Sequence, residues 1–334
     1  MQAHILRNLA LHLLEHYDIA LGHLEPLADY VSEQRCIYRV VSKEGESYML
    51  RALKGNVRKA LQAEAAVLEY LDRRAFPAPH VLLTRANEPV SSHGGWHGLL
   101  LTWIDGNMAD FSEQTLLRLG TLLARLHTLS QRVETESDGA LLPDSRLRST
   151  QFPQRILNQV EQELASMPQE IRPFYGELLA SVRRIQHASP ELPVTLIHGE
   201  CWPHTALLQG RGEPVLIDWK GAGLAPAVLD VGYLLLAAHF GKPQLPVMQP
   251  DPGKITAIVR GYCQERRLLD SELHVLPDAI RLDIAQQAVQ PELRLTLFGN
   301  WRENITLQKL LARFEASAEI ARIAQEQFAT GSVV

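Results

Sequence analysis

The stretch that decides the fold runs from Leu196 to Leu229 and reads LIHGECWPHTALLQGRGEPVLIDWKGAGLAPAVL. It is a short β-rich island in a part of the chain that is otherwise patterned as helix. The acidic Glu200 follows a His-Gly pair, the polar Thr205 comes five positions later, and Asp218 ends an aliphatic run. Side-chain oxygens of this kind are the ligands that Mg²⁺ takes from proteins. The spacing therefore predicts a tight loop with two polar groups beside a strand end with a third.

The overall composition is that of an ordinary globular protein. Of the 334 residues, 46% are hydrophobic and 21% are charged, and the net charge is -5. These values argue against disordered and fibrous proteins. Proteins that bind nucleic acid carry a basic excess, which this chain lacks. A chain of this length has room for two lobes rather than one small core.

The amino-terminal segment, MQAHILRNLALHLLEHYDIAL, lacks the basic region, apolar run and small-residue cleavage site of a leader peptide. It predicts an amphipathic helix with Ile5, Leu9 and Leu13 on one side. No uncharged apolar run approaches the roughly eighteen residues that a membrane span requires. The three cysteines are far apart and form no CxxC pair, which is typical of a reducing compartment. We therefore expect a cytoplasmic protein that binds neither membrane nor nucleic acid.

Residues 1–104 predict a small sheet lobe. After the first helix, the expected elements are two strands, one helix and two strands, at 36–41, 47–53, 58–74, 80–84 and 97–104. The helix has an apolar stripe of Leu61, Ala65, Leu68 and Leu71, and two prolines end it. A loop with Ser91, Ser92, Gly94 and Gly95 joins the last two strands.

Residues 105–334 predict a larger and mostly helical lobe. Leucines recur at helical spacing between residues 112 and 129, and a long polar stretch at 131–149 predicts a loop. Further helical patterns lie at 153–166, at 169–187 and from Pro226 to the end of the chain. The amphipathic pattern of 305–328 fits a helix that covers this lobe or mediates a dimer, and the sequence does not decide the oligomeric state.

The motif residues resemble the aminoglycoside phosphotransferase and choline kinase family. The loop of that family reads His-Gly-Asp-x-x-x-x-Asn, and its metal-binding residue lies in an Ile-Asp-Trp sequence, as Asp218 does here. The resemblance implies an α+β, bilobal, protein-kinase-like fold with a small antiparallel-sheet N-lobe that has one helix and a mostly helical C-lobe. It further implies a kinase that uses ATP and Mg²⁺ to phosphorylate a hydroxyl group of a small molecule.

Other family positions match in the same order along residues 27–235. Arg51 stands where a basic residue contacts the nucleotide phosphates, and Glu64 matches its ion-pair partner. The segment Thr102, Trp103 and Ile104 resembles the linker that holds adenine through its backbone. The segment Leu119–His127 resembles the long helix of the C-lobe, and Asp230 matches an acidic residue that braces the catalytic loop. The ordered set is more specific than any one of these matches.

Three positions depart from the family pattern. Glu200 replaces the expected Asp, Thr205 replaces the expected Asn, and residues 28–35 (ADYVSEQR) lack the glycines of a phosphate-covering loop. One hypothesis is an active kinase in which Glu200 positions or deprotonates the acceptor, Asp218 binds Mg²⁺ and Thr205 is a weak second metal ligand. The alternative is a pseudokinase that binds a nucleotide or metabolite, or acts as a scaffold. Enzyme activity is thus an open question that leans towards the kinase.

Simpler interpretations remain beside these. An isolated arginine such as Arg51 is usually a surface residue, and an aspartate such as Asp218 often only ends a strand. The cluster His198, Cys201 and His204 has an HxxCxxH spacing that invites a zinc site, although no second pair of ligands is evident. His127 lies on an apolar helix face and predicts a packed, hydrogen-bonded histidine. The acidic residues after position 250 either line a pocket for a cationic substrate or lie on solvated helix faces.

Overall fold

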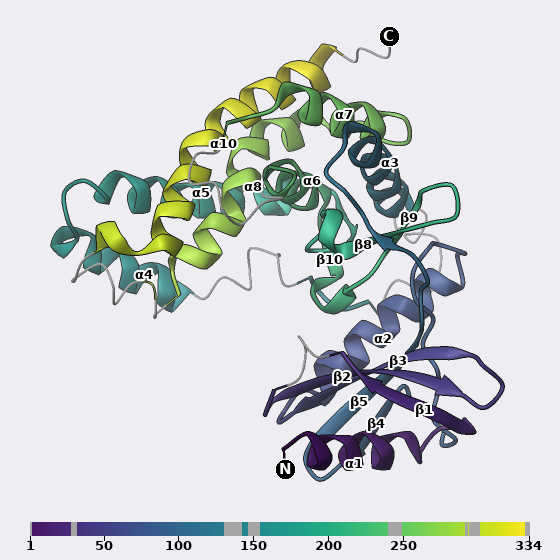
Figure 1. The fold of residues 1–334 in the computed structure, drawn as a ribbon. Coiled ribbons are helices and arrows are strands. Elements are labelled where there is room, and N and C mark those ends of the chain that lie inside the picture. The colour runs from purple at the N-terminus through teal and green to yellow at the C-terminus, as the bar shows by residue number, and fades with distance from the viewer. Residues whose placement is uncertain are drawn as a thin grey trace. The chain divides into compact units, whose positions relative to one another are not determined.

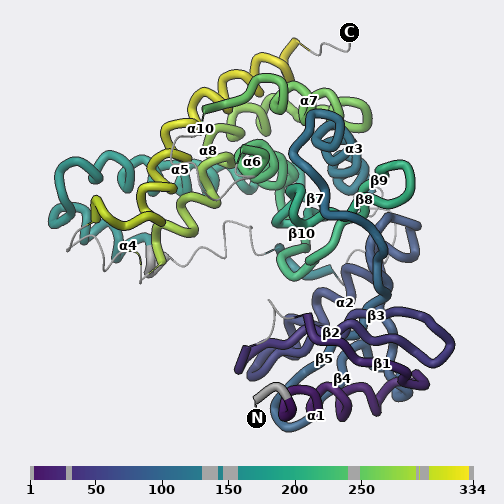
Figure 2. Tube along the Cα trace, in the orientation of Figure 1, coloured from purple at the N-terminus to yellow at the C-terminus, as the bar shows by residue number. Residues whose placement is uncertain are grey.

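The computed structural model describes residues 2–27, 32–129, 142–145, 154–239, 249–290, 293 and 301–330. The chain divides into two compact units (Figures 1 and 2). The first unit comprises residues 1–107, 141–143 and 215–220, and the second comprises 108–140, 144–214 and 221–334. The segment around Asp218 therefore belongs to the first unit, although most of the chain on either side of it belongs to the second.

The first unit is built on one antiparallel sheet of strand order β1-β2-β3-β5-β4. Its strands are β1 (Leu21–Pro26), β2 (Arg35–Ser42), β3 (Ser47–Lys54), β4 (Val90–His93) and β5 (Trp96–Thr102). Its helices are α1 (Gln2–Leu14) and α2 (Arg58–Asp72). The antiparallel sheet expected from the sequence is confirmed, and α2 lies between β3 and β4 along the chain. The helix α1 precedes the sheet and also packs on it.

The strand expected at 80–84 is wrong. Only an isolated bridge between Val81 and Leu101 forms there, and the edge strand is β4, inside the expected loop. The reason is the tight turn at Gly94 and Gly95, whose φ angles of +54° and +79° fold β4 directly back onto β5. The strand β1 was not expected because most of its residues are exposed and its sequence, LGHLEP, has little β-propensity.

The helices of the first unit bury one face each. In α2 the expected stripe of Leu61, Ala65, Leu68 and Leu71 is fully buried. In α1 the buried residues are Leu6, Leu9, Ala10, Leu13 and Leu14, which pack against Leu50, Ala52 and other core residues of the sheet. Ile5 was expected on that face but is 61% exposed, because the spacing i, i+3, i+4, i+7 runs from Leu6.

The second unit is mainly helical. Its helices are α3 (Glu113–Leu129), α4 (Gln154–Glu163), α5 (Arg172–Ala188), α6 (Ala227–Ala237), α7 (Pro252–Cys263), α8 (Asp270–Ala288) and α10 (Ile305–Thr330). The short strands β7 (Val194–Ile197) and β10 (Gly223–Pro226) pair antiparallel. Its other short elements are the strand β8 (Ala206–Gln209) and the single turns η5 (Leu164–Ser166), η6 (Ser189–Glu191), η7 (Pro203–Thr205) and η10 (Trp301–Glu303). Three short elements fall at points where the chain passes from one unit to the other: β6 (Asn107–Met108), β9 (Glu213–Leu216) and the turn η8 (Trp219–Gly221), whose Trp219 and Lys220 belong to the first unit. The helices expected at 112–129, 169–187 and 305–328 correspond to α3, α5 and α10, and that at 153–166 to α4 and η5. Most of the loop expected at 131–149 lies outside the described residues.

Glycines bring two pairs of helices into close contact. A Cβ atom added at Gly261 of α7 would lie 1.9 Å from the carbonyl oxygen of Leu117 in α3, and one added at Gly120 would lie 2.4 Å from that of Ile258. At Gly232 of α6 the added atom would lie 2.6 Å from the backbone of Ala279 in α8. Because the backbones themselves meet, these contacts fix α3 and α6 beside their neighbours.

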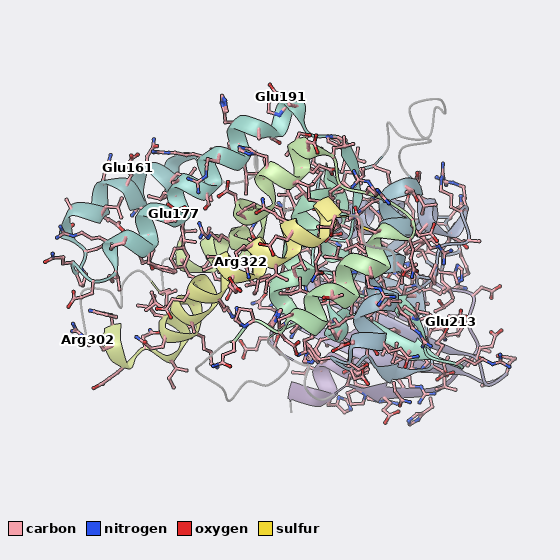
Figure 3. The ribbon with its side chains drawn as sticks, turned by 90° about the horizontal axis from the view of Figure 1, so that it is seen from above. Glu161, Glu177, Glu191, Glu213, Arg302 and Arg322 are labelled. Atoms are coloured by element: carbon pink, nitrogen blue, oxygen red, sulfur yellow. The ribbon has the colours of Figure 1, made fainter. Side chains whose placement is uncertain are left out.

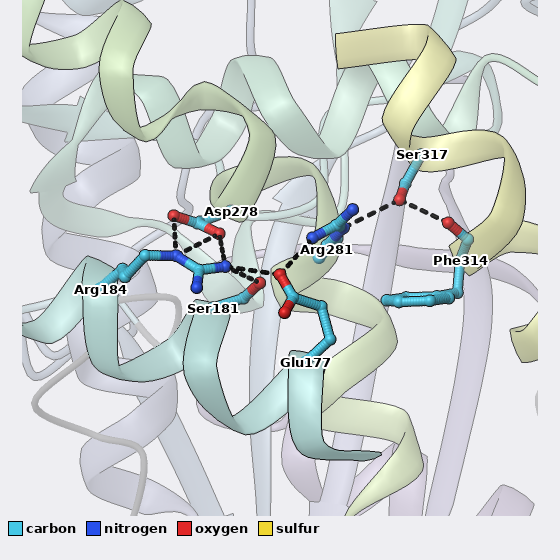
Figure 4. A network of polar contacts seen from close by, with 7 residues as sticks. All are labelled: Glu177, Ser181, Arg184, Asp278, Arg281, Phe314 and Ser317. Atoms are coloured by element: carbon cyan, nitrogen blue, oxygen red, sulfur yellow. Dashed lines mark hydrogen bonds and ion pairs between the residues drawn. The ribbon is translucent and has the colours of Figure 1, made fainter. Parts of the chain in front are cut away.

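A polar network joins α5, α8 and α10 (Figure 4). Arg184 donates two hydrogen bonds from Nε and one from Nη2 to the carboxylate of Asp278, and Glu177 accepts from both Arg184 and Arg281. Asp278 is only 7% exposed, so it neither lines an open pocket nor lies on a solvated face. In contrast, Glu161 and Arg322 lie on the outside of the unit (Figure 3), where both side chains are about half exposed. Within the described residues, no helix is long and apolar enough to cross a membrane.

Candidate functional site

Arg51 and Glu64 form a buried ion pair in the first unit. Arg51 is in β3 and Glu64 is in α2, and they are 7% and 5% exposed. The guanidinium donates a hydrogen bond to the carboxylate of Glu64. Burial opposes the charged form of Arg51, but the carboxylates of Glu64 and Asp218 outweigh it and hold its pKa above the ordinary value. Arg51 is thus not an isolated surface residue, whereas its contact with phosphates stays a prediction.

Asp218 lies beside this pair. Its Oδ1 is 3.8 Å from Nη1 of Arg51, and its Oδ2 is 2.7 Å from Nζ of Lys220. Its φ angle is +64°, a left-handed conformation that costs energy for a residue with a side chain. The next residue, Trp219, is 1% exposed, donates its indole N–H to the carbonyl of Leu216 at 2.9 Å, and meets the ring of Phe76 edge-on. The buried tryptophan therefore anchors a strained backbone that presents the carboxylate of Asp218.

The carboxylate of Asp218 fits a magnesium ion. Its side chain is 34% exposed, and carboxylate oxygens are the hard ligands that Mg²⁺ prefers. Arg51 and Lys220 both offset the charge of this carboxylate. Within the described part of the chain, no group of three or more His, Cys, Asp or Glu side chains is placed to hold a metal ion. An ion at Asp218 would thus need most of its ligands from substrate phosphates and water, which is the usual mode for Mg²⁺.

The linker residues Thr102 and Trp103 use their backbone N–H groups within the first unit. Thr102 donates to the carbonyl of His80 at 2.9 Å, and Trp103 donates to that of Ser47 at 3.1 Å. The indole of Trp103 donates to Asp105 at 3.0 Å, and its ring lies 4.8 Å from the guanidinium of Arg39. The linker is therefore held firmly, and a nucleotide base would have to use the backbone of Ile104 or the carbonyl groups.

The loop from His198 to Thr205 belongs to the second unit. The backbone N–H groups of His198 and Gly199 donate to Oδ2 and Oδ1 of Asp230, at 2.7 and 2.9 Å. Gly199 has a φ of +87°, and an added Cβ there would lie 2.6 Å from the carbonyl oxygen of Gly221. Only glycine fits this position. Asp230 therefore braces the loop, as the sequence resemblance implied.

Thr205 closes the other end of this loop. Its hydroxyl lies 2.7 Å from the carbonyl of Glu200 and 3.0 Å from that of Trp202, and it accepts the N–H of Trp202 at 3.1 Å. The residue is 5% exposed. A hydroxyl has one proton and two lone pairs, so most of its capacity is used inside the loop. Glu200 is half-buried, and its N–H donates to Nδ1 of His198 at 3.2 Å.

A chain of buried polar groups runs from Asp230 to α8. Nε2 of His127 lies 3.3 Å from Asp230, and Nδ1 lies 2.8 Å from the hydroxyl of Tyr262. Arg266 donates to that hydroxyl at 2.8 Å and to both oxygens of Glu272 at 2.9 Å. Burial lowers the pKa of His127 despite the nearby Asp230, which favours the neutral imidazole. His127 is a packed, hydrogen-bonded histidine as expected, but the rest of this chain was not anticipated.

The zinc interpretation of His198, Cys201 and His204 finds no support in their surroundings. Cys201 is fully buried, and burial raises the pKa of its thiol, which disfavours the thiolate that zinc requires. His198 accepts the N–H of Glu200. His204 is exposed, and its ring packs 4.4 Å from that of Trp202. The three residues serve packing and loop geometry.

Comparison with known proteins decides the family. The model of a family described as the phosphotransferase enzyme family matches residues 25–270, which is most of the chain. The chain belongs to this family. No curated protein matches it in sequence.

Solved structures of other proteins share the fold of this chain. The amicoumacin kinase hAmiN in complex with AMP-PNP, Ca²⁺ and Ami is 14% identical, covers 96% of each chain and has a TM-score of 0.67. The spectinomycin phosphotransferase APH(9)-Ia in complex with ADP and spectinomycin is 16% identical over 96% of this chain and 98% of its own, with a TM-score of 0.61. A choline/ethanolamine kinase family protein from Mesorhizobium loti is 16% identical over 99% and 100%, with a TM-score of 0.59. The bilobal kinase-like α+β fold expected from the sequence is thereby confirmed.

The structure groups the candidate residues of this chain into two sets. Arg51, Glu64 and Asp218 lie together in the first unit, and Glu200 and Thr205 lie on one loop of the second. Residues 28–31 of the segment that lacks glycines lie outside the described residues. Beyond them, the hydroxyl of Ser32 accepts the N–H groups of Gln34 and Arg35, at 3.4 and 3.1 Å. Lys220 was missed, although it follows the Ile-Asp-Trp motif directly.

Proposed function

We propose that this protein is a kinase that transfers a phosphoryl group from ATP to a hydroxyl group of a small molecule. The observation that carries the proposal is the buried pair of Arg51 and Glu64 with the carboxylate of Asp218 beside it. A buried ion pair is weak evidence for stability alone, because its desolvation cost offsets most of its Coulomb energy. Its position next to a strained aspartate whose side chain is 34% exposed is better explained by a ligand that the arginine and the aspartate hold together.

Residues 1–104 would form the nucleotide-binding lobe. Arg51, oriented by Glu64, would contact the α- and β-phosphates as a planar, permanently charged donor. The linker Thr102, Trp103 and Ile104 would hold the adenine, and the N–H of Ile104 is the donor best suited to it. Kinase-like relatives solved with AMP-PNP and ADP support an adenine nucleotide as the donor.

Residues 105–334 would form the lobe that carries the catalytic loop. Glu200 would orient or deprotonate the acceptor hydroxyl. Its side chain is one methylene longer than the family's aspartate, and a displaced base loses on the order of a hundredfold in rate. Slow turnover is therefore expected, unless the loop braced by Asp230 and Thr205 compensates for the extra length.

A magnesium ion bound at Asp218 would neutralise charge on the transferring phosphoryl group. The assignment of Thr205 as a second metal ligand would require its hydroxyl to give up bonds within the loop. The substrate would be a small alcohol, and amicoumacin and spectinomycin in the relatives' structures mark only the breadth of that class.

A screen of acceptors by ADP release tests the proposal. The panel should include amino alcohols, aminoglycosides, sugars and hydroxy amino acids, each with ATP and Mg²⁺. With the acceptor found, Asp218→Ala should abolish transfer and Glu200→Gln should reduce it about a hundredfold or more. Asp72→Asn, which removes a half-exposed carboxylate paired with His80, is the matched control and should leave the rate unchanged. Full activity of Glu200→Gln would contradict the role given to Glu200.

The alternative is a pseudokinase that binds a nucleotide or metabolite without transfer. The closed hydroxyl of Thr205 and the two cations that already neutralise Asp218 favour it. Thermal-shift titration with ATP, with and without Mg²⁺, separates the two functions when it is read beside the acceptor screen. Binding of ATP without transfer to any acceptor supports the pseudokinase, and transfer to one acceptor excludes it.

A further inference from the structure

Lys220 is a charged residue next to the candidate metal ligand, and the family motif does not account for it. Its ammonium nitrogen lies 2.7 Å from Oδ2 of Asp218, while Arg51 approaches Oδ1 at 3.8 Å. A cation thus stands at each carboxylate oxygen. With Glu64, these residues form a quartet of two cations and two anions whose net charge is zero.

The backbone fixes the position of Lys220. It lies in the turn η8, between the buried Trp219 and Gly221. Asp218 and Lys220 are therefore the two sequence neighbours of Trp219, whose indole is anchored by a hydrogen bond. The left-handed φ of Asp218 sets the direction in which its side chain projects from the backbone. Exposed pairs of long, mobile side chains contribute little, about 0–1 kcal/mol, and are often incidental. Here one partner is held by the fold, and the side chain of Lys220 remains 48% exposed and so can move.

Thr205, the expected second metal ligand among the described residues of the second unit, offers little to a metal ion. The hydroxyl of Thr205 is 5% exposed and is bonded to the backbone of Glu200 and Trp202. Phosphoryl transfer nevertheless requires positive charge at the β- and γ-phosphates. A lysine ammonium can supply that charge as a mobile point charge with three donors.

We propose that Lys220 is a phosphate-binding residue that takes the place of a second metal ion. Without nucleotide, its ammonium pairs with Asp218. When nucleotide and its metal ion bind, Asp218 would hold the metal ion and the ammonium of Lys220 would move to the β- and γ-phosphates. The inference rests on the proposed binding of ATP and deepens it.

This role has two consequences of opposite sign. In the nucleotide-free protein the ammonium competes with a metal ion for Asp218, so its removal should tighten metal binding. In the complex the ammonium contacts phosphate, so its removal should weaken ATP binding. A residue with a purely structural role would change neither affinity, or both in the same direction.

The experiment measures both affinities in the full-length protein. Mn²⁺ binding to nucleotide-free protein is followed by electron paramagnetic resonance, and the binding of ATP and AMP with Mg²⁺ is followed by calorimetry. For Lys220→Met we expect Mn²⁺ to bind several-fold more tightly and ATP about tenfold more weakly, the usual size of one charge-assisted hydrogen bond. AMP, which lacks the outer phosphates, should bind as it does to the unmodified protein.

Two further variants serve as controls. Lys220→Arg keeps the charge and should restore most of the ATP affinity. Lys54→Met removes an exposed lysine at the end of β3 and should change none of the three affinities. The inference is overturned if Lys220→Met leaves ATP affinity unchanged, or if it shifts the Mn²⁺ and ATP affinities in the same direction. If the unmodified protein binds no ATP, the proposed function fails as well, whereas normal ATP binding that ignores Lys220 overturns this inference alone.

Discussion

Replacing Asp230 with asparagine should loosen the loop that carries Glu200. Asp230 is fully buried and accepts the N–H groups of His198 and Gly199, at 2.7 and 2.9 Å, one on each carboxylate oxygen. Asparagine offers one acceptor oxygen and a donor NH₂ group, so one of the two backbone N–H groups would face another donor.

The magnitude follows from these contacts. A buried N–H group left without a partner costs about 1–3 kcal/mol, and the remaining bond falls from a charged to a neutral one, which costs about 1 kcal/mol more. The sum is about 3 kcal/mol. Because about 1.4 kcal/mol corresponds to a factor of ten, the open state of the loop should become on the order of a hundredfold more populated.

Hydrogen exchange measured by mass spectrometry on the peptide that contains His198 and Gly199 reports this population directly. We expect the exchange of these two amides to accelerate on the order of a hundredfold in Asp230→Asn. Asp72→Asn, which removes an exposed carboxylate of the first unit, should leave the same peptide unchanged. Acceleration of less than about threefold would refute the bracing role of Asp230.

Three further predictions concern packing, charge and pH. Gly261→Ala would place Cβ 1.9 Å from the carbonyl oxygen of Leu117, so thermal unfolding should show that the free energy of unfolding falls by at least about 2 kcal/mol. The control Gly176→Ala in α5 has no atom within 4 Å of the added Cβ and should be neutral or slightly stabilising. Equal melting temperatures for the two variants would contradict the close contact of α3 and α7. Glu64→Ala would leave Arg51 buried without its main partner and should destabilise the first unit by about 3 kcal/mol in urea unfolding, whereas a loss below about 1 kcal/mol would show that Asp218 can replace it. Because burial holds the pKa of His127 below 6.5, this histidine stays unprotonated in the folded chain at pH values just below 6.5, where it binds a proton in the unfolded chain. The contribution of His127 to the free energy of unfolding should therefore be fully present above about pH 6.5 and should decline as the pH falls towards 5. His127→Gln should flatten this decline only in part, because His239 has a lowered pKa as well. An unchanged slope would contradict the lowered pKa of His127.

Local patterns predicted the elements whose periodicity reflects burial. The apolar stripe of α2 is buried as the sequence predicts. The strands β2 and β3 also follow the sequence closely, because their alternate apolar residues join one core with α1. The edge strands β1 and β4 could not be predicted in this way. They are short or exposed and carry Gly, Pro and Ser, so their formation depends on the neighbouring strand and not on their own residues.

Contacts between distant residues account for the parts of the site that were missed. His127 and Tyr262 are 135 positions apart, and no single-sequence pattern indicates that they share a hydrogen bond. The closure of the loop by Thr205 depends on the backbone carbonyl of Glu200, which composition and spacing do not place. Arg51 and Glu64 were paired correctly because a known family order supplied the missing tertiary information. The ion pair of Lys220 with Asp218 was not predicted, because it forms on a left-handed backbone at Asp218 that the sequence does not indicate.

Transfer of the γ-phosphoryl group of radiolabelled ATP to a purified acceptor tests the central claim most directly. The account predicts a labelled phosphate monoester of a small alcohol with the unmodified protein and Mg²⁺. It further predicts no labelled monoester with Asp218→Ala and only a trace with Glu200→Gln. A protein that binds ATP but labels none of a broad panel of hydroxyl compounds, or that labels one equally well without the carboxylate of Asp218, would contradict it.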